Sequence, residues 1–422
     1  MADTRSDHSA PSGGDLLADR SVRFYLVTAG LSSLASFLLG TALAKQIYDV
    51  TGSALALGML GLVEFLPAAL LVPITGSVAD RFDRRRVVAI GLAGEGICSV
   101  LLAWYALSDP TSATPMLVLA FGFGTFRAFV SPAIRSLPPL IGPEGSLPRV
   151  IALLAVTWQL GMIIGPASSG FLYDLDTALP YLTAALLFVF GAVGFASLRP
   201  ARPQHRTPAD QRPSLHHAME GLRLVRRNRV LLGAIALDLF AVLFGGAYAL
   251  LPAIAEDRLG VGNIGYGWLR AAPGFGAVIV TALLAWRPVQ RRIGKVLLTV
   301  VAVFGVATVA LGLTTTYAVA FAALIVLAGA DAVSVFIRST IVPLATPDAM
   351  RGRVMAVENV FIGASNELGA FESGVAAHFL GVATAVVLGG VATCAVVGIW
   401  WLGFRELRDI DRFADLQGHA EE

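Results

Sequence analysis

The sequence predicts an all-α membrane protein with about 12 transmembrane helices in two halves of six. Of its 422 residues, 56% are hydrophobic and only 14% are charged, whereas ordinary soluble domains carry about 25% charged residues. Apolar runs of about 20 residues, enough to cross a bilayer core as a helix, recur along nearly the whole chain. One water-soluble core cannot bury so much apolar surface, so we expect a helical protein that crosses the membrane many times.

The expected spans are apolar runs bounded by charges, proline or glycine clusters. Their approximate limits are 24–47, 54–79, 86–107, 115–137, 149–172, 179–198, 230–252, 265–286, 296–313, 317–343, 353–377 and 381–403.

A segment rich in Pro, Arg and His, residues 199–229, interrupts this pattern. It separates a first half, 24–198, from a second half, 230–403, and tails at 1–23 and 404–422 complete the chain. Near the end of the linker, apolar residues recur at helical spacing, which predicts an interfacial helix that leads into the seventh span.

Basic residues fall in alternate loops, and this asymmetry predicts the orientation of the chain. In the loops on the other side of the membrane, Lys45 and Arg258 are almost the only basic residues. By the positive-inside rule, both termini and the linker are expected on the cytoplasmic side, which an even number of spans also requires. Outside the linker, the basic residues of that side are Arg81, Arg84, Arg85, Arg86, Arg149, Arg287, Arg291, Arg292, Lys295, Arg351, Arg353, Arg405, Arg408 and Arg412.

The loop after the second span, 76-GSVADRFDRRRVV-88, carries a recognisable pattern. Two six-span halves joined by a cytoplasmic linker, with this basic loop, resemble the major facilitator superfamily of secondary transporters. The chain departs from the family's loop signature at Asp83, where glycine is usual. The residues that match the signature are Gly76, Asp80, Arg81, Arg84 and Arg85.

The fifth span contains 161-GMIIGPASSG-170, which is similar to a signature of the superfamily's exporters. Gly161, Gly165, Pro166 and Gly170 carry this resemblance. Small residues four apart let a neighbouring helix approach closely, and proline removes a helical hydrogen bond, so a general packing face is the alternative interpretation. Three further stretches resemble the bacterial branch that contains the enterobactin exporter and related efflux proteins: 131–153, 235–252 and 347–357.

Several charged residues lie inside the expected spans, where each costs about 2.5–3.5 kcal/mol at the bilayer centre unless it has a partner or a wet cavity. Asp331 and Arg338 share one helical stripe, so Asp331 is either paired with Arg338 or is unpaired and able to carry a proton. Glu367 is the competing proton carrier and Asp238 ranks third. Both a functional role and a purely structural buried pair stay open for the deeper charges. Arg135 and Glu358 lie near the cytoplasmic ends of their spans, where snorkelling or pairing at a gate is expected. The other charges within spans are Glu64, Glu95, Arg127, Asp238, Arg270, Asp331, Arg338, Glu367 and Glu372.

The resemblance implies a transporter in a bacterial inner membrane with the pseudo-symmetric halves of the major facilitator fold. We expect a monomer that exports small amphipathic molecules, siderophore-like or drug-like, by alternating access in exchange for protons. Its partners are then the lipid bilayer, the small-molecule substrate and protons, without a cofactor, a metal or a nucleic acid. An importer of the same fold is the alternative. A membrane-embedded enzyme is disfavoured because the sequence holds no His-Glu-x-x-His, Gly-x-Ser-x-Gly or Cys-x-x-Cys motif.

Overall fold

The computed structural model describes residues 16, 18–143, 145–199 and 215–419, with the backbone alone for residues 72, 73, 77, 79, 80, 215–218 and 417–419. Within these ranges the protein is helical and contains no β-strand. The tail 1–23 and the linker 199–229 are therefore described only in part. Gly76, Arg81, Arg84 and Arg85 of the loop signature are described, whereas the side chain of Asp80 lies outside the described set.

The first half of the chain forms six long helices and one short one. Local signals start them: the carboxylate of Asp19 accepts hydrogen bonds from the first turn of α2, and Ser53 and Asp83 cap α3 and α4 in the same way. The helices are α2 (Arg20–Thr51), α3 (Ala54–Arg81), α4 (Arg84–Ala106), α5 (Thr114–Arg135), α6 (Pro138–Ile141), α7 (Leu147–Leu175) and α8 (Leu179–Ser197).

The rest of the described chain consists of the expected linker helix, the spans of the second half and a short tail. Its helices are α9 (Leu215–Arg227) of the linker, α10 (Arg229–Phe244), α11 (Leu251–Ala253), α12 (Asn263–Trp286), α13 (Ile293–Leu313), α14 (Tyr317–Leu344), α15 (Arg351–Leu380), α16 (Val382–Gly403) and, in the tail, α17 (Arg405–Arg408). The described residues also form four short turns: η2 (Ala247–Leu250), η3 (Ile254–Arg258), η4 (Asp348–Met350) and, in the tail, η5 (Phe413–His419).

The seventh span is broken rather than continuous. After α10 the chain passes through Gly245 and Gly246 into η2, and then through α11 into the π-helical turn η3. A Cβ at Gly246 would lie 2.4 Å from the carbonyl oxygen of Gly369 on α15, and one at Gly245 would lie 2.3 Å from the ring of Phe304 on α13. Close packing of two neighbouring helices therefore requires these glycines at the break.

Eleven helical segments in the described residues, with the broken seventh span Arg229–Arg258 counted as one, are long and apolar enough to cross a membrane. The remaining long helix, α15, is not among them, and it carries Glu358, Glu367 and Glu372 within its 30 residues. Large apolar side chains such as Trp104 and Phe379 are more than 70% exposed, as expected for surfaces that face lipid. The chain is thus a multi-pass membrane protein in which α15 is the polar exception.

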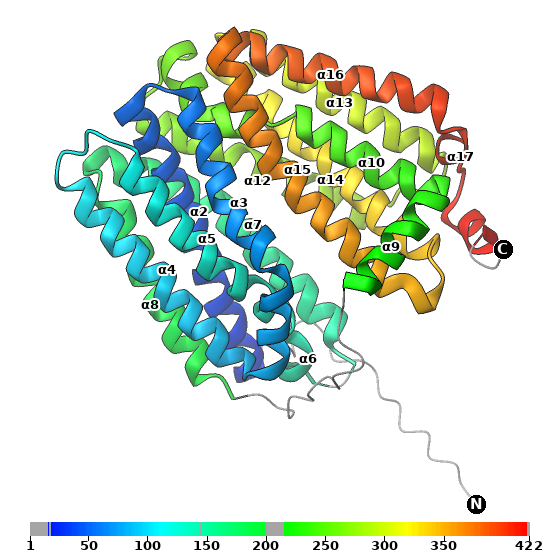
Figure 1. The fold of residues 1–422 in the computed structure, drawn as a ribbon, viewed down its shortest axis with the longest axis horizontal. Helices are drawn as coiled ribbons and strands as arrows, with labels where there is room; N and C mark the ends of the chain where they lie inside the picture. The colour runs from blue at the N-terminus through cyan, green and yellow to red at the C-terminus, as the bar shows by residue number, and fades with distance from the viewer. Residues whose placement is uncertain (1–15, 17, 144, 200–214, 420–422) are drawn as a thin grey trace, which may run out of the picture.

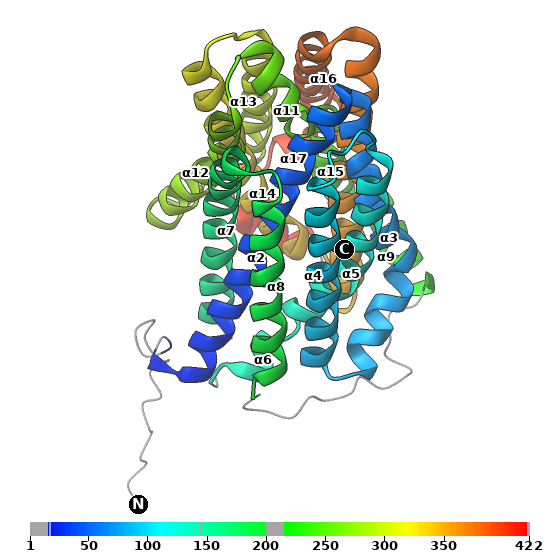
Figure 2. The ribbon, with the colours of Figure 1, turned by 90° about the vertical axis from the view of Figure 1, so that its left-hand side faces the viewer.

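The long helices form two groups, which lie side by side in Figure 1. In Figure 2 the first group faces the viewer and its helices run roughly vertically. In the first, α2 packs on α7 and α8, and α4 packs on α5 and α8. In the second, α12 and α13 pack on α14, and α10 packs on α15 and α16. The groups meet mainly through α7 with α12 and α3 with α15, where Gly170 faces Gly267 and Gly58 faces Gly374.

Candidate functional site

Arg338 on α14 forms a buried ion pair with Asp238 on α10. Its Nη2 lies 2.7 Å from Oδ1 of Asp238, and the two side chains are only 4% and 8% exposed. The Nε of Arg338 also donates to Oγ of Ser334, at 3.3 Å. Of the two alternatives left open for Asp331, the structure therefore shows the one without an ion pair to Arg338. Seven residues along a helix separate Asp331 from Arg338 by about 10 Å, and Asp238 is nearer.

Asp331 and Asp238 nevertheless line one small pocket. This cavity has a volume of about 10 Å³, roughly the space of one water molecule. Ser334 adds a hydroxyl to its wall, and the rest of the lining is apolar, including Val301 and Phe304 of α13. The arrangement brings two carboxylates and one arginine together inside the second half.

The first half holds a looser pair. Nη1 of Arg127 on α5 lies 3.7 Å from Oε2 of Glu95 on α4, which is too long for a hydrogen bond. Glu95 is fully buried, and neither of its carboxylate oxygens has a hydrogen-bond partner in the structure. Arg127 instead donates to Ser36 of α2 and lies over the ring of Phe123. Sequence analysis included Glu95 among the mid-span charges, but its complete burial depends on how α4 packs and could not be read from the sequence.

Three charged residues lie where the halves meet. Glu64 of α3 and Glu367 of α15 come from opposite halves and are electrostatic neighbours, and Arg270 of α12 acts on both. The oxygen Oε2 of Glu367 lies against α3, 3.2 Å from where a Cβ of Gly61 would be. Arg270 also donates to the carbonyl oxygen of Tyr248 at 2.8 Å. Glu64 and Glu367 were expected as site residues, whereas Arg270 was noted only as a charge within a span.

A set of polar contacts, here called the latch, joins the halves at the end where α2 stops and η3 lies. Lys45 of α2 pairs with Asp49 and lies 2.9 Å from Glu256 of η3. The hydroxyl of Tyr48 donates to Asp257. The hydroxyl of Tyr266 donates to the carbonyl of Thr41 at 3.3 Å and completes the latch. Within the first half, the hydroxyl of Tyr173 supports the latch residue Asp49 at 2.7 Å. From the sequence, Lys45 was expected only as a rare basic residue on that side, because its partner Glu256 lies 211 residues further along the chain.

The loop signature lies between α3 and α4, at the other end of the molecule. Nη1 of Arg84 donates to the carbonyl of Ser136 at 2.9 Å, and Arg85 bonds to the carbonyl of Leu198 and to Asp83. Asp83 replaces the usual glycine and serves as the N-cap of α4, with an ordinary φ of −63°. The hydrogen bond from Arg85 lowers the pKa of Asp83, and the charge of Arg86 adds to this effect.

The exporter signature lies at two helix contacts. A Cβ at Gly165 would lie 2.7 Å from Cβ of Phe37 on α2, and Gly161 faces the same helix at Leu34. A Cβ at Gly170 would lie 2.9 Å from Cα of Gly267 on α12, whose own Cβ would meet the carbonyl oxygen of Pro166 at 2.7 Å. The signature therefore packs α7 against its own half and against the other half.

A family model described as Major Facilitator Superfamily matches residues 25–365 of the chain. Macrolide efflux protein A of Streptococcus pyogenes is 28% identical over 247 residues, which are 56% of this chain and 59% of that protein. The enterobactin exporter EntS of Shigella boydii serotype 18 is 26% identical over 337 residues, 77% of each chain.

Solved structures share the fold at low sequence identity. A bacterial homologue of the human lysosomal transporter Spinster, in an inward-facing and unoccupied conformation, matches with a TM-score of 0.70 and 15% identity over 96% of this chain and 98% of that one. The D323A mutant of the nucleoside transporter NupG matches with a TM-score of 0.72 and 12% identity over 92% of this chain and 100% of that one. The resemblance found in the sequence is confirmed: the chain belongs to the Major Facilitator Superfamily, whose members are membrane transporters and not enzymes.

Proposed function

We propose that the protein exports small amphipathic molecules by alternating access and exchanges them for protons. The names of the macrolide and enterobactin relatives support export and this class of substrate. The signature in α7 supports the same direction. In this proposal the termini are cytoplasmic and the latch closes the outer end of the molecule, so the structure represents the inward-facing state.

The observation that carries the proton-coupled mechanism is the pair of acids beside Arg338. Asp238 and Asp331 share one small cavity and one arginine. With both acids ionised, this group carries one net negative charge within the membrane, which a low-polarity environment strongly disfavours. One proton makes it neutral, and Asp331 is the acid that takes it because Asp238 is already held by Arg338.

The proton then controls how α10 and α14 pack. If Asp331 loses its proton, its charge competes with Asp238 for Arg338 and weakens the contact between the two helices. Because α10 packs on α15 and α15 on α3 of the other half, a change at α10 is transmitted to the contact between the halves. A proton bound at Asp331 thereby favours one of the two states of the alternating-access cycle.

The substrate space in this proposal is bordered by the charges at the contact between the halves. Glu64, Arg270 and Glu367 lie there, and Arg127 acts on Glu64 from α5. Acids and arginines from both halves can each offer a contact to an amphipathic molecule when the halves separate. Because the site contains both acids and arginines, its net charge stays small. A charged substrate is therefore not bound too tightly to be released.

The test uses purified protein in lipid vesicles with an imposed pH gradient and two probes, a macrolide antibiotic and enterobactin. We expect Asp331→Asn to abolish accumulation driven by an acidic vesicle interior but to keep downhill substrate exchange, which needs no net proton movement. Ser334→Ala is the matched control, because it changes the same cavity wall without removing a charge, and it should accumulate substrate normally.

Two outcomes would count against the proposal. Full gradient-driven accumulation by Asp331→Asn would assign the coupling elsewhere, with Glu367 as the next acid to test. Accumulation driven by an acidic exterior instead of an acidic interior would indicate transport in the same direction as the proton, as in an importer.

A further inference from the structure

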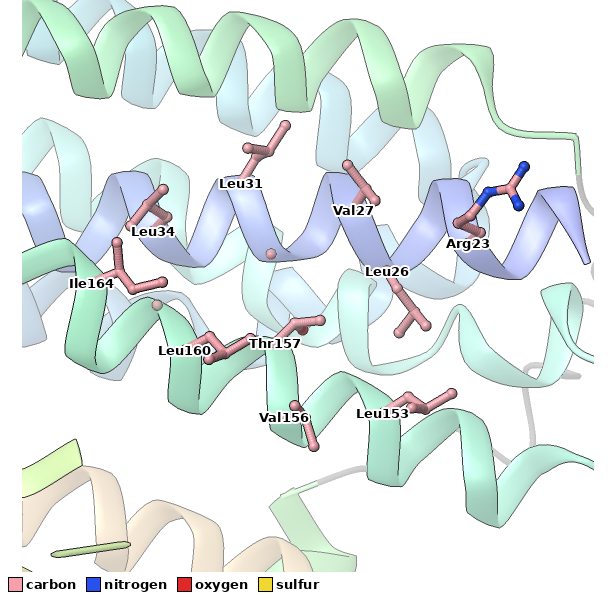
Figure 3. Close-up of a pocket in the computed structure, with 12 residues that line it drawn as sticks. Arg23, Leu26, Val27, Leu31, Leu34, Leu153, Val156, Thr157, Leu160 and Ile164 are labelled. Atoms are coloured by element: carbon pink, nitrogen blue, oxygen red, sulfur yellow. The ribbon is translucent and has the colours of Figure 1, made fainter. Parts of the chain in front are cut away.

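A groove runs along the outer surface of the first half between α2 and α7, here called the α2–α7 groove. Its volume is about 390 Å³, within the range of small-molecule sites. Figure 3 shows its walls, with Leu31 and Leu34 on α2 and Val156 and Leu160 on α7. Gly30 adds no side chain to this wall, and a Cβ there would lie 3.4 Å from Cβ of Thr157.

The groove faces lipid rather than the interior of the transporter. Val27 lies nine residues before Ser36, which is two and a half helical turns and so the opposite face of α2. Ser36 bonds to Arg127 on the inner side. The groove side chains Val27, Val156 and Leu160 are each about half exposed, at 55%, 51% and 49%.

The lining favours an unbranched apolar chain. Thr157 is the one hydroxyl in the wall, and it already donates to the carbonyl oxygen of Leu154 at 2.8 Å. A ligand rich in hydroxyl or amide groups would leave these groups without hydrogen-bond partners here, which disfavours its binding. From Arg23 to Leu34 the groove extends about 16 Å along α2, close to half of the roughly 30 Å hydrocarbon core. The groove thus has the depth of one lipid leaflet.

One end of the groove is basic. Arg23 belongs to its lining and lies at the end of the labelled row in Figure 3. Arg20 precedes it by one turn on α2, and Arg149 precedes the lining residue Leu153 by one turn on α7, and all three arginines are exposed. Exposed arginines at a membrane surface attract anionic lipid headgroups.

We propose that the α2–α7 groove binds one acyl chain of an anionic glycerophospholipid whose phosphate group lies at Arg20, Arg23 and Arg149. The bound lipid holds α2 against α7, the helix that contacts α12 of the other half. This proposal does not depend on which molecule the protein transports.

Native mass spectrometry of the full-length protein tests it, with phosphatidylglycerol and phosphatidylcholine of identical acyl chains as probes. We expect the wild type to retain at least threefold more phosphatidylglycerol than phosphatidylcholine. The variant Arg23→Gln/Arg149→Gln should lose this preference. The control Arg86→Gln/Arg287→Gln, which removes two other exposed arginines, should keep it.

A second variant tests whether the acyl chain binds in the α2–α7 groove. Val27→Trp places a ring in the groove, and folding should tolerate it because the side chain is exposed, so retention of phosphatidylglycerol should fall at least threefold. Val306→Trp, on α13 and 61% exposed, is the control and should leave retention unchanged. Equal retention of the two lipids by the wild type would overturn the proposal, as would normal lipid retention by Val27→Trp.

Discussion

Each half of the protein buries one acid with one arginine, and the two pairs are built differently. Asp238 and Arg338 are 2.7 Å apart and both almost fully buried. Glu95 and Arg127 are 3.7 Å apart, and Arg127 remains 29% exposed. Breaking a well-formed buried pair leaves an uncompensated charge, whereas a buried acid without hydrogen bonds has few contacts to lose. The comparison indicates that the second-half pair fixes the packing of α10 on α14, while Arg127 is free to change its contacts.

The largest expected effect is on the tight pair. Arg338→Ala should lower the free energy of unfolding by roughly 3–5 kcal/mol, because Asp238 is left buried and unpaired. Replacing both residues, as Asp238→Leu/Arg338→Met, should restore most of the loss, since apolar side chains fill the same volume. Thermal unfolding in detergent, followed by tryptophan fluorescence, measures both variants. Equal losses in the single and double variants would show that the pair has no special role in folding.

The next effect concerns the contact between the halves, which can be loosened without changing either pair. Tyr48→Phe removes one hydrogen bond to the carboxylate of Asp257 in the latch, and hydrogen bonds to charged groups contribute about 1.5–3 kcal/mol. The population ratio of the two end states should therefore shift about tenfold or more towards opening at the latch end.

Spin-label distances measure this shift, with Asp176→Cys and Val319→Cys as label sites in a background without Cys98 and Cys394. Tyr105→Phe is the matched control, because its hydroxyl bonds only within the first half, to the carbonyl oxygen of Ser112. An unchanged distance distribution in Tyr48→Phe would mean that the latch does not hold the halves together.

The loose pair should respond much less in stability. Glu95→Gln removes a buried charge without breaking any hydrogen bond of the carboxylate, so the free energy of unfolding should change by no more than about 1 kcal/mol. The same thermal unfolding measurement applies. A loss as large as that of Arg338→Ala would show that the two pairs are equivalent, and the comparison would then fail.

Most of the spans could be predicted from the sequence because apolar length determines them, with the polar helix α15 as the exception. Each expected span corresponds to a long helix or, for the seventh, to a broken one. The break at Gly245 and Gly246 could not be predicted, since it depends on how closely α13 and α15 approach. The partner of Arg338 was missed for the same reason. A helical stripe shows which residues share a face, but the residue on the neighbouring helix is known only once the helices are packed.

The candidate site was only partly accessible from the sequence. Asp238, Asp331 and Arg338 were expected to matter, and the structure places them together, although with a different pairing. Glu64 and Glu367 were expected separately, and their proximity follows from the contact of α3 with α15. The latch was not anticipated because a charge at the end of a span is ordinary in a membrane protein, and only tertiary structure brings such charges from two halves together.

The smallest expected effect is at a third acid–arginine pair, Asp83 with Arg85, which lies outside the membrane spans and is partly exposed. Because its folded-state pKa is lowered, ionised Asp83 stabilises the protein above its unfolded-state pKa of about 3.9. This contribution is lost as the pH falls through the lower folded-state value. Asp83→Asn keeps an N-cap and removes only the charge, so it should cost at most about 0.5 kcal/mol at pH 7. Unfolding midpoints at pH 7, 5 and 3 should show a small difference from the wild type that disappears at the lowest pH.

The control is Asp83→Ala, which also removes the cap and should cost about 1 kcal/mol at pH 7. A loss of stability for Asp83→Asn as large as that for Arg338→Ala would mean that burial does not set the strength of these acid–arginine pairs.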